Sequence, residues 1–532
     1  MKLAKPFSTL IAVIAVAPFA FGQATAPVRT QYGLVQGTVV DSVRVFKGIP
    51  FAAPPVGDLR WQGPQPPKPW KDVKKTVTYA PGCMQVPIVN EALGLAPVTP
   101  SEDCLYLNVW TPAKSSRAHL PVMVWIYGGG FTIGATSMPQ YDGENLAKRG
   151  VVYVSIAYRL GPLGFLADFE LTKEQGGHSG NYGLLDQIAG LKWVKHNIAA
   201  FGGNPDKLTI FGESAGGISV SMLCASPLAN GLFQGAISES GGSFAPARVD
   251  HEGGAGPPTL AEAEKTGEAF LTRLGVSSIA QARKLSAADV YKQTGPGLGG
   301  GGWWPNFDGY VLLGDQYKLY QEGKYNDTPI LIGTNADEGA LFVASTTMQK
   351  YKESVENGYG EFARDILTAY PDNSETQALR SARDLARDAT FGWSTWSWAR
   401  LQSSTGKGKV FMYYFNHRPQ YPDEARFKDW GAAHGSEIAF VFGNFTKQMP
   451  ATPEDKTVSE QLMLYWTNFA KYGNPNGNGL PEWPAFTDAD PRVMELDDPS
   501  HAVPVPNLEQ LKALDSYFAW RRKQEASQLS GD

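Results

Sequence analysis

The sequence has no excess of basic residues and little charge of either sign. Lysine and arginine together number 47 against 52 acidic residues, which gives a formal net charge of −5, and charged residues make up 19% of the 532 positions. Such a chain implies no basic face, which argues against nucleic acid or an anionic membrane surface as the main partner. The mean hydropathy is −0.25, and the sequence has no long apolar run apart from one near its N-terminus. These two features exclude a polytopic membrane protein.

Internal repeats and proline-rich linkers are also missing. At about 100–200 residues per domain the length would allow three or four domains, but large α/β enzymes often use such a length as one domain. Hydrophobic residues make up 42% and aromatic residues 12% of the chain, whereas a disordered chain would be poorer in both. We therefore predict a single domain over residues 27–532, preceded by a short leader.

Cysteine is scarce, with only Cys83, Cys104 and Cys224 in the sequence. Cysteine and histidine do not occur at metal-binding spacings, and nucleotide-binding fingerprints are absent, so no metal or organic cofactor is expected. Cys83 and Cys104 bracket a loop whose closure by a disulfide would stabilise the fold by about 3 kcal/mol. Cys224 follows an apolar helical run and is expected to be a buried free thiol.

The leader, residues 1–26, has the features of a secretory signal peptide. Lys2 and Lys5 precede the apolar run Leu10–Phe21, which is too short to span a bilayer easily, and small residues follow within Gly22–Ala26. We expect cleavage in that last stretch and a periplasmic or extracellular location, where disulfides persist. The alternative is an uncleaved anchor or a buried first helix.

Short apolar segments alternate with segments of helical periodicity along the chain. The apolar residues of Leu184–His196 have helical spacing. The segment Thr347–Gln402 is rich in helix formers and predicts a helical insertion. Between them, Gly295–Gly302 is expected to be either a mobile loop near a pocket or a surface connection. This alternation predicts a mostly parallel sheet flanked by helices. The expected strands are Pro121–Tyr127, Val151–Tyr158, Leu208–Phe211, Ile330–Gly333 and Val410–Phe415.

The strongest motif is Gly-Glu-Ser-Ala-Gly at Gly212–Gly216, between an expected strand and the apolar helical run Ile218–Leu223. In this context a G-x-S-x-G sequence forms a sharp turn that exposes a serine at a helix N-terminus. The glycines have no Cβ, so neighbouring elements can pack closely against the turn. We predict that Ser214 is a nucleophile.

A nucleophilic serine needs an oxyanion hole, a base and an acid that orients the base. Three glycines, Gly128–Gly130, follow the strand at Tyr127, and their uncovered N–H groups could bind an oxyanion together with the N–H of Ala215. Of the seven histidines, the candidate bases that follow Ser214 are His251, His417, His434 and His501, and His434 lies in a loop of small residues after the last expected strand. The candidate acids, Asp337 and Glu338, follow the strand Ile330–Gly333, and spacing alone does not choose between them.

Four ordered stretches resemble the type-B carboxylesterase family, which includes the cholinesterases. The resemblance covers nearly the whole chain from about Val28 to about Asp497, and it implies an α/β-hydrolase fold in which helical insertions shape a gorge. The four stretches are Phe46–Trp61 (FKGIPFAAPPVGDLRW), Ser101–Trp110 (SEDCLYLNVW), Gly180–Gly217 (GNYGLLDQ through FGESAGG) and Tyr465–Pro475 (YWTNFAKYGNP).

The resemblance also implies roles for single residues. By matching of motifs, the catalytic triad falls on Ser214, Glu338 and His434, and no metal or cofactor takes part. The remaining matches are oxyanion donors at Gly129, Gly130 and Ala215, supporting polar groups at Glu213 and Ser240, and a disulfide between Cys83 and Cys104.

The expected activity is hydrolysis of carboxylic esters through an acyl-enzyme on Ser214. Amide hydrolysis, an interfacial lipase activity with Gly295–Gly302 as a lid, and a non-catalytic adhesion or binding role are the alternatives. The expected partner is a small-molecule ester, apolar or aryl rather than charged. Aromatic residues could line a cleft, although several of them will be core residues, since tryptophan is mostly buried. The candidates are Phe131, Phe244, Trp303, Trp304, Trp393, Trp396 and Trp398.

Overall fold

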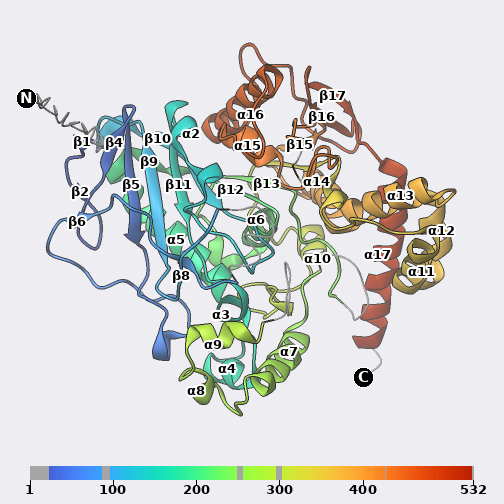
Figure 1. Ribbon diagram of the computed structural model, residues 1–532, viewed down its shortest axis with the longest axis horizontal. Coiled ribbons are helices and arrows are strands. Elements are labelled where there is room, and N and C mark those ends of the chain that lie inside the picture. The colour runs from blue at the N-terminus through green and yellow to red at the C-terminus, as the bar shows by residue number, and fades with distance from the viewer. Residues whose placement is uncertain are drawn as a thin grey trace, which may run out of the picture.

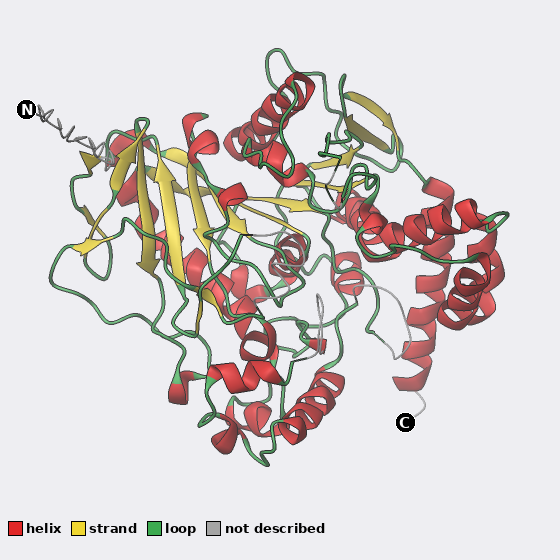
Figure 2. Cartoon of the chain, in the orientation of Figure 1, coloured by secondary structure: helices red, strands yellow, loops and turns green. Residues whose placement is uncertain are grey.

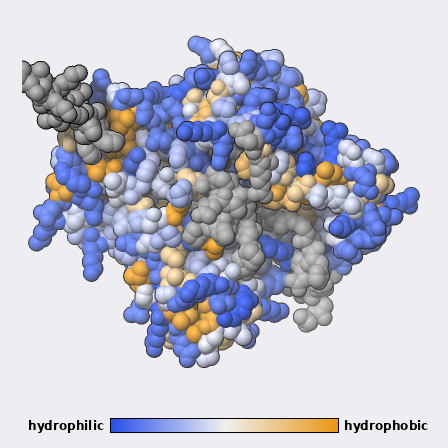
Figure 3. All heavy atoms as spheres, viewed as in Figure 1, coloured by the Kyte–Doolittle hydropathy of each residue, from blue (hydrophilic) through white to orange (hydrophobic). Residues whose placement is uncertain are grey.

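The computed structural model describes residues 23–86, 96–248, 256–294, 302–423, 425 and 427–529. The expected leader therefore lies outside the described residues up to position 22, and so does the glycine-rich stretch at positions 295–301. Within the described residues, no helix is both long enough and apolar enough to cross a membrane. The face of the molecule in Figure 3 is largely hydrophilic, with apolar side chains in small separate groups.

A twelve-stranded sheet runs through the described part of the chain (Figures 1 and 2). The strands from β11 to β16 pair in parallel, and antiparallel strands lie at both edges. This arrangement confirms the prediction of a mostly parallel sheet. In spatial order the strands are β1 (Gln23–Ala24), β4 (Thr38–Val40), β5 (Val43–Pro50), β9 (Tyr106–Thr111), β11 (Val152–Ile156), β10 (Leu120–Ile126), β12 (Gly203–Glu213), β13 (Gly235–Glu239), β14 (Ile330–Asn335), β15 (Val410–Phe415), β16 (Arg492–Leu496) and β17 (His501–Pro504).

Two small sheets lie outside the main one. The first joins β2 (Val28–Arg29), β3 (Leu34–Gln36) and β6 (Lys74–Lys75), and the second pairs β7 (Gly82–Cys83) with β8 (Pro100–Ser101).

Helices cover both faces of the main sheet and form a separate group beyond its β15–β17 end (Figure 1). The helical segment predicted around Thr347–Gln402 consists of α11 to α14 with a π-helical turn at Asp388–Gly392. The α-helices are α2 (Glu144–Lys148), α3 (Gly161–Phe165), α4 (Phe169–Glu174), α5 (Tyr182–Asn197), α6 (Ala215–Ala225), α7 (Leu260–Arg273), α8 (Ile279–Ala282), α9 (Ala287–Lys292), α10 (Gln316–Gln321), α11 (Met348–Tyr359), α12 (Ala363–Ala369), α13 (Glu375–Arg387), α14 (Trp393–Thr405), α15 (Glu437–Phe442), α16 (Pro453–Tyr472) and α17 (Leu508–Leu529).

Side chains at the end of β13 show which helices cover which face. Successive residues of a strand point to opposite faces of its sheet. Ser238 donates its hydroxyl to the carbonyl of Gly217 in α6, whereas Glu239 accepts a hydrogen bond from the indole of Trp466 in α16. Helices α6 and α16 therefore lie on opposite faces of the sheet.

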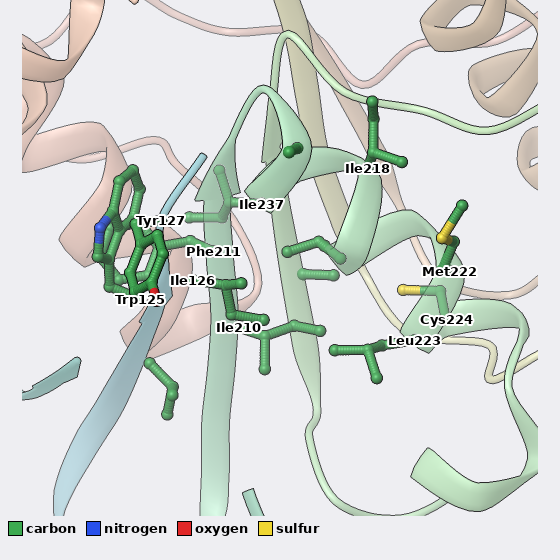
Figure 4. Close-up of a cluster of buried hydrophobic side chains, with 14 of the residues drawn as sticks. Trp125, Ile126, Tyr127, Ile210, Phe211, Ile218, Met222, Leu223, Cys224 and Ile237 are labelled. Carbon is green, nitrogen blue, oxygen red and sulfur yellow. The ribbon is translucent and has the colours of Figure 1, made fainter. Parts of the chain in front are cut away.

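The hydrophobic core lies on both faces of the main sheet, between its strands and the helices that cover each face, because the central strands are buried on both faces. In β12, Phe211 packs with its ring centroid 4.8 Å from that of Trp125 in β10, which in turn lies 5.0 Å from Phe442 in α15. On the other face, apolar side chains of β12 and α6, including Ile210 and Leu223, fill the space between strand and helix (Figure 4). Burial on both faces explains why these strands read as continuous apolar runs.

A disulfide joins Cys83 to Cys104, and Cys224 is a buried free thiol in α6. Because the bridge closes a loop across a sequence separation of 21, the double variant Cys83→Ala/Cys104→Ala is expected to lose about 3 kcal/mol of unfolding free energy. Denaturant titration measures this loss. The wild-type protein, unfolded without reductant, should expose a single reactive thiol; three reactive thiols would contradict the bridge.

Candidate active site

A cavity of about 630 Å³ opens at the carboxyl ends of the parallel strands, where sites of α/β proteins assemble. Ser214 and His434 both line this cavity. They come from distant parts of the chain, since Ser214 follows β12 and His434 lies in the connection from β15 to α15. The sheet therefore brings together two residues that the sequence places 220 positions apart, by their numbers (434 − 214).

Ser214 occupies a tight turn between β12 and α6, at φ +56° and ψ −125°. A non-glycine residue at positive φ is strained, so the surrounding structure must hold it there. The Ser214 N–H donates to the carbonyl of Glu239 at 2.9 Å, and the Ser214 carbonyl accepts from the N–H of Ile218 at 2.8 Å.

The glycines on either side of Ser214 are required by the close approach of β10. A Cβ at Gly216 would lie 2.0 Å from the carbonyl oxygen of Ile126, and one at Gly212 would lie 2.5 Å from the same oxygen. Any larger residue would push the helix away from the strand. The structure thus confirms the reason given for these glycines from the sequence.

The imidazole of His434 is held by a buried carboxylate. His434 Nδ1 lies 2.5 Å from Glu338 Oε2, and Glu338 Oε1 accepts hydrogen bonds from the Ser240 hydroxyl and from the Asn335 N–H. Asp337, the other candidate acid, turns away from the imidazole, because its carboxylate accepts from the N–H of Ala432 at 3.0 Å. The geometry therefore selects Glu338 as the partner of His434.

The other side of the imidazole faces Glu213, the residue before the elbow serine. His434 Nε2 lies 3.3 Å from Glu213 Oε1, while the Ser214 hydroxyl makes no hydrogen bond to any described residue. Catalytic hydrogen bonds are often long or unformed before substrate binds. Because Glu213 and Ser214 are consecutive residues, we expect a rotation of the imidazole to bring Nε2 from Glu213 to Ser214.

Backbone N–H groups surround the mouth of the elbow. Gly129, at φ +111°, and Gly130, at φ +59°, line the cavity beside Ala215, and the N–H groups of these two glycines have no acceptor among the described residues. Ala215 is the first residue of α6, and the first N–H groups of a helix have no partner within it. All three of these residues line the same cavity as Ser214, so their N–H groups are candidates for binding an oxyanion.

A comparison with protein families matches residues 24–513 to the carboxylesterase family. The chain belongs to this family. Para-nitrobenzyl esterase of Bacillus subtilis (strain 168) is 37% identical over 493 residues, which cover 88% of this chain and 94% of that protein. Carboxylesterase 1D of Rattus norvegicus is 37% identical over 522 residues, covering 88% and 89%.

Another relative and the solved structures agree with this assignment. Fumonisin B1 esterase of Sphingopyxis macrogoltabida is 36% identical over 493 residues, covering 86% of this chain and 84% of that protein. A solved structure of PNB esterase superposes with a TM-score of 0.78 at 36% identity, covering 92% of this chain and 99% of that one. The protein is a carboxylic ester hydrolase with the α/β-hydrolase fold.

The cavity wall of this carboxylesterase is rich in aromatic residues, and most of the candidates named from the sequence belong to the core, as was expected for several of them. Among the seven predicted residues only Trp304 lines the cavity; Phe131 packs behind Trp304 at 4.8 Å, and the other five are buried elsewhere in the core. Trp393, Trp396 and Trp398 belong to α14, which packs against the sheet and α17. Trp303 packs against Phe270, and Phe244 packs against Tyr320 and Trp398. The aromatic residues that line the cavity beside Trp304 are Tyr141, Phe342, Phe391, Tyr421, Phe427 and Trp430.

Four buried glutamates surround the imidazole and the strand ends beneath it. Burial raises the pKa of Glu213 to about 7, and the nearby charge of Glu338 adds to the rise, although the charge of His434 opposes it. Burial likewise raises the pKa of Glu239 to about 8, opposed by its hydrogen bond from Trp466. Glu437, whose carboxylate accepts from the Asn335 side chain, has a pKa well above its ordinary value because it is fully buried.

The carboxylates also determine the charge of the imidazole. Burial lowers the pKa of His434, but the negative charges of Glu213 and Glu338 and the hydrogen bond to Glu338 outweigh it, so that the pKa is raised. A base must be neutral to accept a proton, and activity should therefore rise with pH through a value above the ordinary histidine pKa.

The variant Glu213→Gln removes the negative charge nearest to His434 Nε2. Because that charge raises the pKa of His434, the acidic limb of the kcat/KM profile should move to lower pH. A pH–rate series on a p-nitrophenyl ester measures the shift. Glu437→Gln, which removes a buried carboxylate that does not contact the imidazole, is the matched control and should move the limb less. An unmoved limb in Glu213→Gln would contradict the electrostatic account.

Proposed function

We propose that this protein is a secreted or periplasmic serine carboxylesterase that hydrolyses apolar or aryl esters through an acyl-enzyme on Ser214. The observation that carries the proposal is the convergence at one cavity of a strained elbow serine and an imidazole held by a buried glutamate. The same arrangement of nucleophile, base and orienting acid drives acyl transfer on unrelated folds.

In the first half-reaction His434 Nε2 accepts the Ser214 hydroxyl proton as Ser214 Oγ attacks the ester carbonyl carbon. The carbonyl oxygen becomes an oxyanion, to which the N–H groups of Gly129, Gly130 and Ala215 donate. Glu338 keeps the proton of His434 on Nδ1 and stabilises the imidazolium. Each oxyanion donor contributes about 3 kcal/mol to lowering the barrier.

The tetrahedral intermediate then collapses. The bond from the acyl carbon to the alcohol oxygen breaks, and the imidazolium gives its proton to that oxygen, so the alcohol leaves neutral. Water next attacks the acyl-enzyme, with His434 again accepting the proton, and Ser214 Oγ leaves with that proton. The products are one carboxylic acid and one alcohol, and the residues return to their starting states.

The composition of the wall supports an apolar or aryl substrate. Among the described residues that line the cavity, acidic or basic side chains occur only at Glu213, His434 and Lys447, and the rest of the wall is mainly aromatic and aliphatic. A volume of about 630 Å³ lies within the usual range for small-molecule sites, which is roughly 300–1,000 Å³.

The leader and the disulfide support a location outside the cytoplasm. Residues 1–26 have the pattern of a cleaved signal, and the Cys83–Cys104 bridge fits an oxidising compartment. The intact mass of the protein recovered from periplasm or medium should correspond to a chain that begins within residues 23–27. A full-length chain confined to the cytoplasm would contradict this part of the proposal.

Turnover of p-nitrophenyl esters of increasing acyl length, beside the matched p-nitroanilides, tests the reaction class. We expect hydrolysis of dissolved esters and little or no hydrolysis of the anilides, with a decline once the acyl chain outgrows the cavity. Comparable rates on anilides would indicate an amidase. Activity that appears only above the solubility limit of the ester would indicate an interfacial lipase.

A further inference from the structure

The imidazole of His434 has a neighbour that the ester-hydrolysis mechanism does not use. The ring of Phe391 is parallel to it, with ring centroids 4.7 Å apart and an interplanar angle of 10°. Phe391 is 2% exposed, so water does not compete for this contact. Phe342 also approaches the imidazole, but at 5.6 Å and 49°, and it is 47% exposed. Phe391 therefore covers one face of the catalytic ring.

Phe391 is presented by an irregular segment of backbone. It lies in the π-helical turn Asp388–Gly392, which joins α13 directly to α14. π-Helical turns are rare and are found frequently at functional sites. A Cβ at Gly392 would lie 2.8 Å from Asp388 Oδ1, so a larger residue there would crowd the turn.

The buried guanidinium of Arg387 links this turn by hydrogen bonds to the loop that contains Glu338. Arg387 forms two hydrogen bonds to the Asp388 carboxylate, at 2.7 and 2.9 Å, and its Nη1 donates to the carbonyl of Ala336 at 3.0 Å. Ala336 stands two residues before Glu338, the partner of His434 Nδ1. The same anchor thus fixes the segment that carries Phe391 and the segment that carries the acid.

We propose that Phe391 is a positioning residue for His434, whose ring face guides the imidazole during its pivot and stabilises the imidazolium. The inference rests on the proposed Ser–His–Glu mechanism. In the resting structure Nδ1 is hydrogen-bonded to Glu338, whereas Nε2 lies 3.3 Å from Glu213 Oε1, which accepts no hydrogen bond from the described residues. When Nε2 moves to Ser214, the contact with Glu213 is lost. The hydrogen bond to Glu338 and the stack on Phe391 then remain to hold the imidazole, and the stack confines its movement to its own plane.

The charge of the imidazole gives the stack a second effect. An aromatic face attracts a cation that lies within about 6 Å of its centre, and the attraction is larger where water is excluded. The charged groups that act on His434 are two carboxylates, Glu213 at the end of β12 and Glu338 in the turn after β14. Glu437 in α15 and Glu239 of β13 are buried nearby and act on these two glutamates. The carboxylates stabilise the imidazolium charge from the edges of the ring or through the core, whereas Phe391 stabilises it from the face of the ring.

The variant Phe391→Leu keeps an apolar side chain but removes the aromatic face. With p-nitrophenyl acetate, whose small acyl group depends little on the wall, kcat is expected to fall about tenfold with KM changed by less than about twofold. Because the neutral base is then favoured, the acidic limb of the kcat/KM profile should move to lower pH. Phe391→Tyr keeps the aromatic ring. It should retain most of the wild-type kcat, and the acidic limb of its kcat/KM profile should stay at the wild-type pH.

Phe342→Leu is the matched control, since it makes the same change on the tilted and exposed ring. We expect it to alter KM for long-chain esters and to leave the acidic limb in place. Equal movement of the limb in Phe342→Leu and Phe391→Leu, or no movement in Phe391→Leu, would overturn the proposal.

A measurement without turnover separates this inference from the proposed function. In the NMR spectrum of histidine-labelled protein, the His434 ring protons should be shifted upfield by the Phe391 ring current, and the shift should vanish in Phe391→Leu and persist in Phe391→Tyr. His434→Gln assigns the signal. Unchanged shifts in Phe391→Leu would disprove the stack whether or not the protein hydrolyses esters, whereas inactivity towards all esters with the ring-current shift present would reject the proposed function alone.

Discussion

Replacing Ser214 with alanine is expected to lower kcat/KM for p-nitrophenyl esters by a factor of about 10⁴ to 10⁶. The loss is large because the variant has no atom that can form the acyl-enzyme, and what remains is catalysis by oxyanion binding alone. Steady-state kinetics with high enzyme concentration, to reach the residual rate, measures the effect.

The fold should survive this change. The Ser214 hydroxyl makes no hydrogen bond to any described residue, and the backbone bonds to Glu239 and Ile218 do not depend on the side chain. Ser436→Ala, at a second cavity-lining serine whose buried hydroxyl has no partner among the described residues, is the matched control and should lose far less activity. Comparable losses in the two variants, or near-wild-type activity in Ser214→Ala, would contradict the assignment of the nucleophile.

The variant Glu338→Gln is expected to lower kcat by about 10⁴-fold. Glu338 Oε1 accepts from the Ser240 hydroxyl and the Asn335 N–H, so a glutamine would place its amide oxygen there and direct its NH₂ group at His434 Nδ1. The imidazole would then carry its proton on Nε2, where it cannot accept the proton of Ser214. The change therefore reverses the tautomer as well as removing a charge.

Asp337→Asn provides the comparison for this result, since spacing in the sequence does not distinguish the two carboxylates. Asp337 accepts from the N–H of Ala432 and has a side chain that is 34% exposed, so its amide variant should retain most of the activity. If Asp337→Asn lost as much activity as Glu338→Gln, the carboxylate at position 338 would not be the specific partner of the base. Both variants are assayed over a pH series, because a tautomer defect is not rescued by raising the pH.

Local backbone requirements made part of this site predictable from the sequence. The elbow at Gly212–Gly216 could be predicted because a strand, a sharp turn and a helix within a few residues demand glycine at fixed positions, and the structure has that geometry. Strand β15 was predicted with its observed bounds, Val410–Phe415, since it is a continuous apolar run. Spacing left the acid open between two neighbours, and the family resemblance chose Glu338.

Tertiary contacts decided what the sequence could not show. Strand β13 was not predicted, because Gly235–Glu239 is short and mixes apolar with polar residues. Its last residue, Glu239, nevertheless accepts hydrogen bonds from the Ser214 N–H and from the indole of Trp466. The sequence could not show which aromatic candidates line the cavity, since whether a tryptophan faces a core or a cavity depends on how helices pack. The π-helical turn that presents Phe391 has no sequence signal at the level of composition or periodicity.

An acyl-enzyme on Ser214 can be detected by a burst experiment followed by mass spectrometry. Mixed rapidly with a slowly deacylating p-nitrophenyl ester, the protein should release a burst of nitrophenolate equal to its active-site concentration. The peptide that contains Ser214 should gain the acyl mass, and an organophosphate added first should abolish the burst and label the same peptide. Acyl mass on a peptide without Ser214, or turnover with neither burst nor label, would contradict the account.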